Sequence, residues 1–187
     1  MAIQRLALVT GANRGIGLEV ARVLVAQGVH VVIGARDGRK GQEAASALAD
    51  SGGQAGSVAL DVACAASVAH ASAEIADRFG PIDILVNNAG ILIDGPGGFN
   101  ASVFDMLDET MRTTFETNVI GPARLVRAVV PGMKARGYGR VVNVSSMAGQ
   151  LSEMASGYPA YRMSKSALNA LTRTVAAGVA GSNVKVN

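Results

Sequence analysis

Short apolar segments alternate with segments of helical periodicity along almost the whole chain. Residues 6–10 and 29–33 are expected strands, and residues 15–27 between them carry apolar side chains at helical spacing. Further strands are expected at 57–60, 82–86, 140–144 and 184–187, and further helices at 38–50, 67–79, 103–136 and 159–180. This order predicts an α/β fold, with a doubly wound parallel sheet, helices on both faces and right-handed crossovers.

Two interruptions are expected in this pattern. The Gly121-Pro122 pair lies inside the long helix and is expected to kink or split it, because proline has no N–H donor and clashes with the preceding turn. Residues 91–102 contain several glycines and are expected to form a loop. No linker or internal repeat divides the chain, so residues 1–187 are expected to form one domain.

The composition fits a folded domain with an apolar core. Of the 187 residues, 49% are hydrophobic and 17% are charged, which argues against disorder. The net charge is +3 and the basic residues are scattered, so a nucleic-acid partner is not expected. His30 and His70 lack ligand spacing, so no metal site is expected.

The single cysteine, Cys64, fits a reducing compartment. The N-terminus has no signal-peptide pattern, and no apolar run reaches the roughly 18 residues that a membrane-spanning helix needs. We therefore expect a cytoplasmic protein without a membrane partner.

A glycine-rich turn follows the first expected strand. Residues 10–17 read Thr-Gly-Ala-Asn-Arg-Gly-Ile-Gly, with glycines at 11, 15 and 17. Glycine lets the backbone approach a phosphate closely, and the start of the next helix offers free N–H groups and a positive dipole end. The spacing differs from the general Gly-x-Gly-x-x-Gly pattern, but its place between a strand and a helix predicts dinucleotide binding.

The end of the second strand bears on which dinucleotide binds. An acidic residue there would hold a ribose hydroxyl, whereas arginine suits a 2′-phosphate. If Ala35 holds this position, Arg36 and Arg14 are able to clamp a phosphate together, which favours NADP(H). Asp37 keeps NAD(H) open as the alternative, because it lies at about the expected acidic spacing from the glycine turn.

A second group of polar residues points to proton transfer. Tyr161 and Lys165 lie four residues apart, on one face of an expected helix. Ser146 precedes them in a Val-Asn-Val-Ser-Ser segment. A nearby ammonium group favours the phenolate form of a tyrosine, which helps the phenol to exchange a proton. Together with a dinucleotide site, this group predicts proton transfer coupled to hydride transfer.

With these motifs, the chain resembles the short-chain dehydrogenase/reductase family from Leu6 to Lys165 and beyond. The resemblance implies a Rossmann-like sheet and places the family's catalytic residues at Asn118, Ser146, Tyr161 and Lys165. It places cofactor contacts at Gly11, Asn13, Arg14, Gly15, Ile16, Gly17, Arg36, Asp61, Val62, Asn88, Ala89, Gly90, Tyr161 and Lys165. The segment 35–37 is similar to that of NADPH-dependent carbonyl reductases in the family.

In this family, the tyrosine is the general acid in reduction and the general base in oxidation. The resemblance implies that Ser146 binds the substrate oxygen, that Lys165 binds the nicotinamide ribose, and that Asn118 holds a water linked to Lys165. The implied function is NADP(H)-dependent interconversion of a ketone or aldehyde and an alcohol. The alternatives are an NAD(H)-dependent alcohol dehydrogenase and a nucleotide-binding regulatory protein without turnover.

The sequence departs from the family pattern in two places. The gap of 15 residues from Ser146 to Tyr161 is longer than usual, so the loop 150–158 is expected to be extended. Tyr158 lies nearer the usual spacing, but its i+4 residue is Arg162, so Tyr158 is not the expected catalytic phenol. The sequence also ends at 187, before the family's substrate lid and last strand, and is therefore expected to be truncated.

Residues 166–180 are apolar nearly all round. One face of this helix is expected to cover the sheet, so the other needs a partner. We therefore expect a homodimer or homotetramer through helices 103–136 and 159–180, an assembly mode common in the family.

Overall fold

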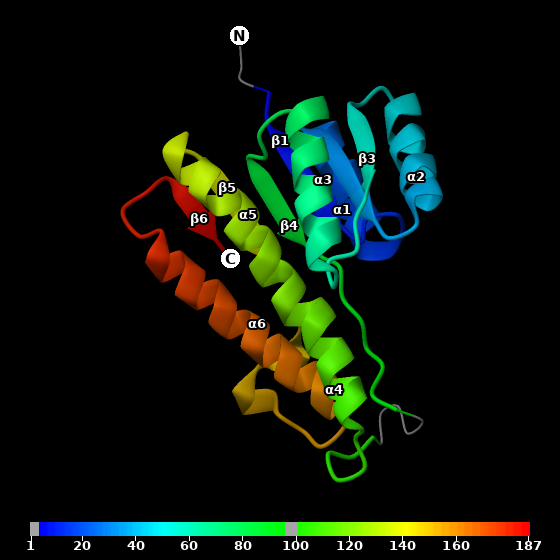
Figure 1. Cartoon of the computed structure of the whole chain (residues 1–187), viewed down its shortest axis with the longest axis vertical. Helices are drawn as coiled ribbons and strands as arrows, with labels where there is room; N and C mark the ends of the chain where they lie inside the picture. Colours follow the sequence, from blue (N-terminus) through cyan, green and yellow to red (C-terminus); the bar gives the residue numbers. More distant parts are fainter. Residues whose placement is uncertain (1–3, 96–100) are drawn as a thin grey trace.

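The computed structural model describes residues 4–95 and 101–187, which form a three-layer α/β domain around a parallel sheet (Figure 1). The six strands lie in the order β3-β2-β1-β4-β5-β6. Their bounds are β1 Leu6–Thr10, β2 His30–Ala35, β3 Ala55–Ala59, β4 Ile84–Asn87, β5 Gly139–Asn143 and β6 Val184–Val186. This order confirms the expected doubly wound, Rossmann-like fold. Successive strands are added on one side from β1 to β3 and on the other side from β4 to β6, and ligands bind at such a switch in strand order in open α/β sheets.

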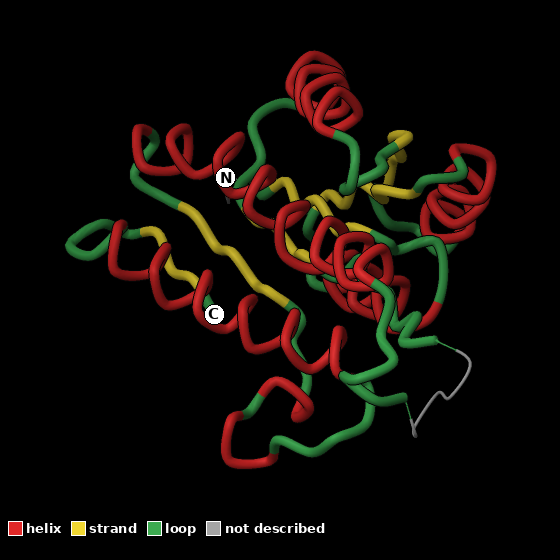
Figure 2. The backbone as a smooth tube through the Cα atoms, turned by 60° about the horizontal axis from the view of Figure 1, so that its bottom comes forward, coloured by secondary structure: helices red, strands yellow, loops and turns green. Residues whose placement is uncertain are grey.

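Helices cover both faces of the sheet, as Figure 2 shows. The helices are α1 Gly15–Ala26, α2 Gly38–Asp50, α3 Ala65–Arg78, α4 Asp108–Phe115, α5 Gly121–Ala135 and α6 Pro159–Gly178. One apolar cluster joins α1 and α2 to one face, and a larger cluster joins α3, α5 and α6 to the other. Among the described residues, no helix has the length and apolar character needed to cross a bilayer.

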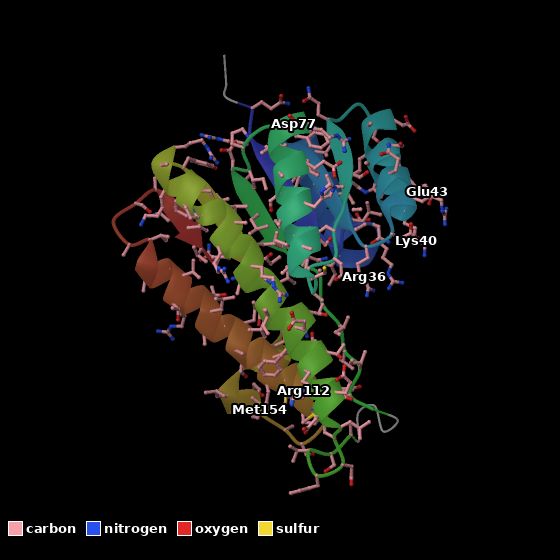
Figure 3. The ribbon with its side chains drawn as sticks, in the orientation of Figure 1. Arg36, Lys40, Glu43, Asp77, Arg112 and Met154 are labelled. Carbon is pink, nitrogen blue, oxygen red and sulfur yellow. The ribbon has the colours of Figure 1, made fainter. Side chains whose placement is uncertain are left out.

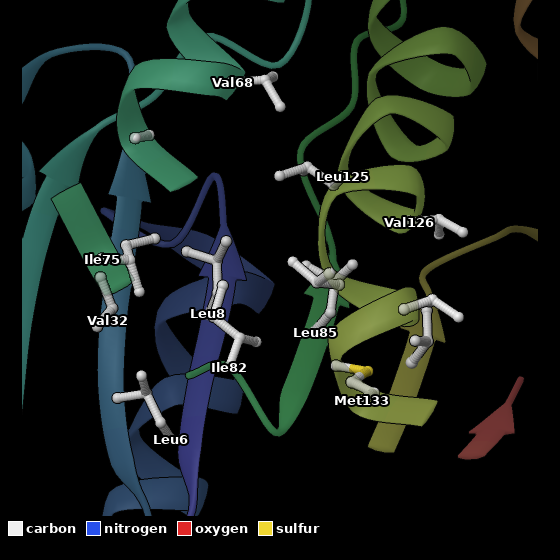
Figure 4. Close-up of a cluster of buried hydrophobic side chains, with 14 of the residues drawn as sticks. Leu6, Leu8, Val32, Val68, Ile75, Ile82, Leu85, Leu125, Val126 and Met133 are labelled. Carbon is white, nitrogen blue, oxygen red and sulfur yellow. The ribbon is translucent and has the colours of Figure 1, made fainter. Parts of the chain in front are cut away.

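The register of the central strands builds the larger cluster. Leu8 of β1 lies beside Val32 of β2 and Leu85 of β4, and all three side chains are buried on the same face (Figure 4). Their neighbours at the next position point to the opposite face, because side chains alternate along a strand. Both faces of the sheet are thus buried, which accounts for strands that are apolar at almost every position.

The expected elements are correct in type, and their bounds differ from the structure by at most two residues, except at the start of the long helix. That helix begins at Asp108, so the expected start at residue 103 is wrong. Asp108 and Glu109 lie in its first turn, where carboxylates interact favourably with the helix dipole. The apolar Phe104 and Leu107, which suggested an earlier start, are exposed. Within the expected loop 91–102, residues 96–100 lie outside the described residues.

The expected irregularity near Gly121-Pro122 is present. Residues Glu116–Ile120 form a π-helical turn between α4 and α5. Pro122 has no N–H to donate to the carbonyl of Asn118, which is four residues earlier. Gly121 packs against Val62, and a Cβ at residue 121 would lie 2.9 Å from the Val62 carbonyl oxygen. The distorted turn therefore directly precedes the point where α5 packs against the segment after β3.

Leu8→Ala tests how much the larger apolar cluster contributes to the stability of the fold. The Leu8 side chain is fully buried between two strands, so its truncation should lower the free energy of unfolding by about 2–5 kcal/mol. Urea denaturation measures this change. Val23→Ala on α1 is the matched control, because Val23 is 60% exposed and its truncation should cost less than about 1 kcal/mol. Equal losses for the two variants would contradict the assigned core.

Candidate active site

A cavity of about 1000 Å³ opens at the carboxyl ends of β1, β2 and β4. Its lining comes from the glycine turn, the start of α2, the segment after β3, the segment after β4, and Thr113 and Thr117 of the long helix. The cavity thus lies at the switch in strand order between β1 and β4. Ten of the predicted cofactor-contacting residues line it: Gly11, Asn13, Arg14, Gly15, Arg36, Asp61, Val62, Asn88, Ala89 and Gly90.

The remaining predicted residues lie outside this lining. Ile16 is exposed, and Gly17 is buried beneath the turn. A Cβ at Gly17 would lie 2.4 Å from Asn88 Nδ2 and 2.9 Å from the Gly11 carbonyl oxygen, so only glycine lets α1 pack this closely. Asn118, Ser146, Tyr161 and Lys165 also lie outside the lining, beyond its Gly90 end.

The start of α1 provides an anion-binding geometry. Gly11 and Gly15 adopt positive φ angles of +63° and +58°, which favour glycine. Arg14 occupies the N-cap position of α1, and no side chain caps the helix there. The first turn also lacks an acidic residue. Its N–H groups therefore remain able to bind a phosphate, as the glycine pattern predicts.

Thr10 joins the two strand ends that border the cavity. Its Oγ1 accepts hydrogen bonds from the backbone N–H groups of Asn88 and Ala89, each at 3.0 Å. The Asn88 side chain in turn donates to the carbonyl oxygens of Thr10 and Gly11, at 2.9 and 3.3 Å. The glycine turn and the segment 87–90 at the end of β4 therefore form one hydrogen-bonded unit. Thr10 was not a predicted site residue, and only its position directly before Gly11 signals its role.

Basic side chains gather at the end of the cavity beside α2. Ala35 is the last residue of β2, and Arg36 follows it. Arg14, Arg36 and Lys40 all line the cavity. Figure 3 shows Arg36 and Lys40 near one another beside α2. Asp37 also lines the cavity, but one of its carboxylate oxygens caps α2 by accepting the N–H groups of residues 39 and 40 at 3.0 and 3.2 Å.

Asp61 and Val62 follow β3 and form another wall. The Asp61 carboxylate accepts the N–H of Ala63 at 3.0 Å, while its own N–H donates to Ser67 Oγ at 2.9 Å. Arg124 of α5 donates to the Ala63 carbonyl at 3.0 Å. These bonds hold the segment 61–63 in place, so that it lines the cavity.

Tyr161 and Lys165 lie together on the first two turns of α6, as their spacing predicts. The Lys165 Nζ is 5.6 Å from the centre of the Tyr161 ring and donates to the Val144 carbonyl at 2.7 Å. Lys165 is 5% exposed, and this burial lowers its pKa. A Cβ at Gly90 would lie 3.6 Å from Lys165 Nζ, so this ammonium group lies directly beside the cavity wall.

Ser146 lies in a turn that is attached to α6. Its Oγ accepts the Ala148 N–H at 3.2 Å and caps a short 3-10 helix, Met147–Gly149. Gly149 packs directly on the backbone of Lys165, where a Cβ would come within 2.7 Å of the lysine carbonyl carbon. The Gly149 carbonyl also accepts hydrogen bonds from Ser166 and Asn169 of α6. The structure therefore brings the Ser146 turn against the helix of Tyr161.

The expected loop between Ser146 and Tyr161 is partly ordered into 3-10 turns. A second such turn spans Leu151–Glu153, and Arg162 donates to the carbonyls of Glu153 and Gly157. The extra residues thus fold back on the start of α6. Burial and, secondly, the Asp94 carboxylate raise the pKa of Tyr158. A raised pKa is unfavourable for a proton-exchanging phenol.

Asn118 lies in the π-helical turn and is 1% exposed. Its Oδ1 accepts the Ile91 N–H at 2.8 Å, and its Nδ2 donates to the Ile91 carbonyl at 2.9 Å and to Ser164 Oγ at 3.0 Å. The side chain therefore connects the segment after Gly90 to α6. Its expected role in holding a water remains a prediction.

Asp94 is a further buried residue of this region that was not predicted. Its carboxylate accepts the N–H groups of Ala160 and Tyr161, at 2.6 and 3.1 Å. The partners are 66 and 67 residues away in sequence, so no local pattern signals the contact. Within residues 4–95 and 101–187, no group of three or more metal-ligating side chains is placed to hold a metal ion.

Comparison with known proteins places this arrangement in a family. Residues 5–187 match the family described as short chain dehydrogenase. The human dehydrogenase/reductase SDR family member 4 is 36% identical over 98% of this chain and 63% of its own length. A putative ketoacyl reductase of monensin polyketide synthase from Streptomyces virginiae is 40% identical over 98% of this chain and 68% of its own length. The chain thus spans about two thirds of the length of these relatives.

Solved structures agree with this grouping. A short-chain dehydrogenase from Streptomyces avermitilis superposes with a TM-score of 0.88 at 35% identity, covering 100% of this chain and 64% of that one. A variant of actinorhodin polyketide ketoreductase, solved with NADPH, gives a TM-score of 0.89 at 34% identity, covering 100% and 70%. With the family match over residues 5–187 and these two folds, the chain belongs to the short-chain dehydrogenase family.

Proposed function

We propose that the protein is an NADP(H)-dependent oxidoreductase that interconverts a carbonyl compound and an alcohol. The observation that carries this proposal is the position of Lys165 directly beside Gly90, with its Nζ 5.6 Å from the centre of the Tyr161 ring, at one end of a cavity whose other parts suit a dinucleotide. The names of the relatives, which are dehydrogenases and ketoacyl reductases, support the same reaction class.

The residues of the cavity fit a dinucleotide. The uncapped start of α1 suits the pyrophosphate, and the close packing at Gly17 fixes the turn that presents it. Arg14 and Arg36 suit a 2′-phosphate, since a guanidinium group is able to donate two parallel hydrogen bonds to two phosphate oxygens. Asp37 is engaged in capping α2, which makes it a poorer partner for a ribose hydroxyl. Its place in the cavity lining is the observation that favours NAD(H) as the second candidate.

The chain's own residues perform the proton transfer in this proposal. A bound nicotinamide dinucleotide supplies or accepts the hydride. Tyr161 donates a proton to the substrate oxygen during reduction and takes it back during oxidation. The Ser146 hydroxyl already accepts a backbone N–H, so its own hydrogen is available to the same oxygen. The ammonium group of Lys165 favours the phenolate that remains on Tyr161 after donation.

Proton replacement follows a path that begins at Lys165. This residue is buried, and its ammonium group donates to the Val144 carbonyl. Asn118, which is buried in the π-helical turn beside Gly90, would hold a water in this path. We propose that this water connects Lys165 to solvent.

Tyr161→Phe tests the proposed acid–base role in the full-length protein. Removal of the hydroxyl should lower kcat by at least about 100-fold, because general acid–base catalysis contributes roughly 10²–10⁴ in rate. Nucleotide affinity should change by less than about threefold. Steady-state ketone reduction and fluorescence titration measure these two quantities. Tyr158→Phe is the control and should keep near-normal turnover. If Tyr161→Phe retains most of the activity, the acid–base role of Tyr161 is refuted.

Arg36→Ala tests the cofactor preference. Loss of this guanidinium should weaken NADPH binding by at least about tenfold, or roughly 1.4 kcal/mol, and should change NADH binding little. Titration of both nucleotides measures the difference. Arg39→Ala is the matched control, because Arg39 is exposed and pairs with Glu43 of its own helix. If the unmodified protein binds NADH as tightly as NADPH, the preference for NADP(H) is refuted.

We also propose that the protein forms a homodimer or homotetramer through α4–α5 and α6. These helices lie side by side on one face of the sheet, as Figures 1 and 2 show. Light scattering of the full-length protein should give the mass of a dimer or tetramer. A mass that stays monomeric at micromolar concentration would remove this proposal.

A further inference from the structure

The helix that carries Tyr161 begins without a cap from its own sequence. The preceding residue, Tyr158, has a left-handed backbone conformation with φ 54° and ψ 51°, and its side chain does not cap the helix. Pro159 occupies the first turn and has no N–H. The next backbone N–H groups, those of Ala160 and Tyr161, therefore need an acceptor from elsewhere in the fold.

Asp94 supplies that acceptor. Its Oδ1 lies 2.6 Å from the Ala160 nitrogen and its Oδ2 lies 3.1 Å from the Tyr161 nitrogen, so the two oxygens hold consecutive N–H groups. The residue is 3% exposed. A carboxylate in this place also interacts favourably with the positive end of the α6 dipole. One of its two bonds thus fixes the backbone of the residue that carries the phenol.

The segment that carries Asp94 is attached to the site at its other end as well. Asn118 binds both the N–H and the carbonyl of Ile91, directly after Gly90. Residues 91–94 therefore form a strap from the Asn118 side chain to the start of α6. Because Gly90 lies beside the Lys165 ammonium group, the strap begins where the cavity and α6 meet.

Other bonds hold the later turns of α6. Gly149 accepts from Ser166 and Asn169, and Thr172 accepts from the side chain of Asn143 at the end of β5. These contacts attach the middle of the helix to the sheet and to the Ser146 turn. The N–H groups of residues 160 and 161 depend on Asp94, so loss of this carboxylate should loosen the start of the helix while the later turns stay in place.

We propose that Asp94 is a positioning residue for Tyr161, which holds the phenol at the substrate oxygen by fixing the first turn of α6. This inference rests on the proposed acid–base role of Tyr161. A merely structural cap would affect stability alone. A positioning residue also affects turnover in the folded, nucleotide-bound protein, because a shift of a catalytic group by about 1 Å lowers the rate by roughly 100-fold.

The test compares Asp94→Ala and Asp94→Asn in the full-length protein, measuring kcat, KM, nucleotide affinity and backbone amide hydrogen exchange. In Asp94→Ala, kcat should fall about 10- to 100-fold. Nucleotide affinity and KM should change by less than about threefold, and exchange should accelerate at residues 160 and 161 but not in β1 or β4. Asp94→Asn should recover part of kcat, because its amide oxygen still accepts one N–H. Asp77→Ala is the matched control, an exposed carboxylate on α3 (Figure 3).

Each outcome decides the proposal. Faster exchange at residues 160 and 161 with unchanged kcat overturns it, as does an equal loss in Asp77→Ala. If Asp94→Ala does not fold, Asp94→Asn decides on the same two readouts. Tyr161→Phe in parallel separates the two levels of inference. If Tyr161→Phe keeps full activity, the acid–base role of Tyr161 is wrong. If Tyr161→Phe is inactive while Asp94→Asn and Asp94→Ala are both fully active, only the positioning role of Asp94 is wrong.

Discussion

The hydrogen bonds of the Thr10 hydroxyl are the interaction on which the rest of the site depends. They tie the end of β1 to the segment after β4, at the place where the chain leaves these two neighbouring strands toward opposite faces of the sheet. A cavity opens at such a place because no crossover covers it. The Asn88 side chain adds bonds to the Thr10 and Gly11 carbonyls, so both residues hold the glycine turn against the segment that leads to Gly90. The segments proposed to bind the dinucleotide and the segment beside the proposed proton-transfer residues therefore share one frame.

Much of the fold was predictable because each element carries its own periodic pattern. Strands such as 29–33 are short and apolar, and helices such as 15–27 repeat apolar residues at helical spacing. The start of the long helix was not found correctly. Phe104 and Leu107 fit a helical period but are exposed, whereas Asp108 and Glu109 fit the dipole of a helix start. Electrostatics at the helix terminus outweighed the apolar pattern there.

The site was predictable to the extent that its parts are local motifs. Tyr161 and Lys165 share one helix, so their spacing alone places them together. The roles of Asp94 and of the Asn118 side chain depend on contacts between segments far apart in sequence. Such contacts follow from how the elements pack, and no residue pattern encodes them. Thr10 lies between these cases, since its position is local but its partners are on another strand.

The π-helical turn at Glu116–Ile120 also sets the rotational phase of the long helix. Such a turn takes in one extra residue, and one residue corresponds to a rotation of about 100° around a helix axis. Thr113 before the turn and Thr117 at its start line the cavity, while the part after it presents Leu125 and Val129 to the core. The number of residues in this turn therefore sets the rotation between the surface that faces the cavity and the surface that faces the sheet. A one-residue deletion there would leave both surfaces chemically intact and aim one of them in the wrong direction.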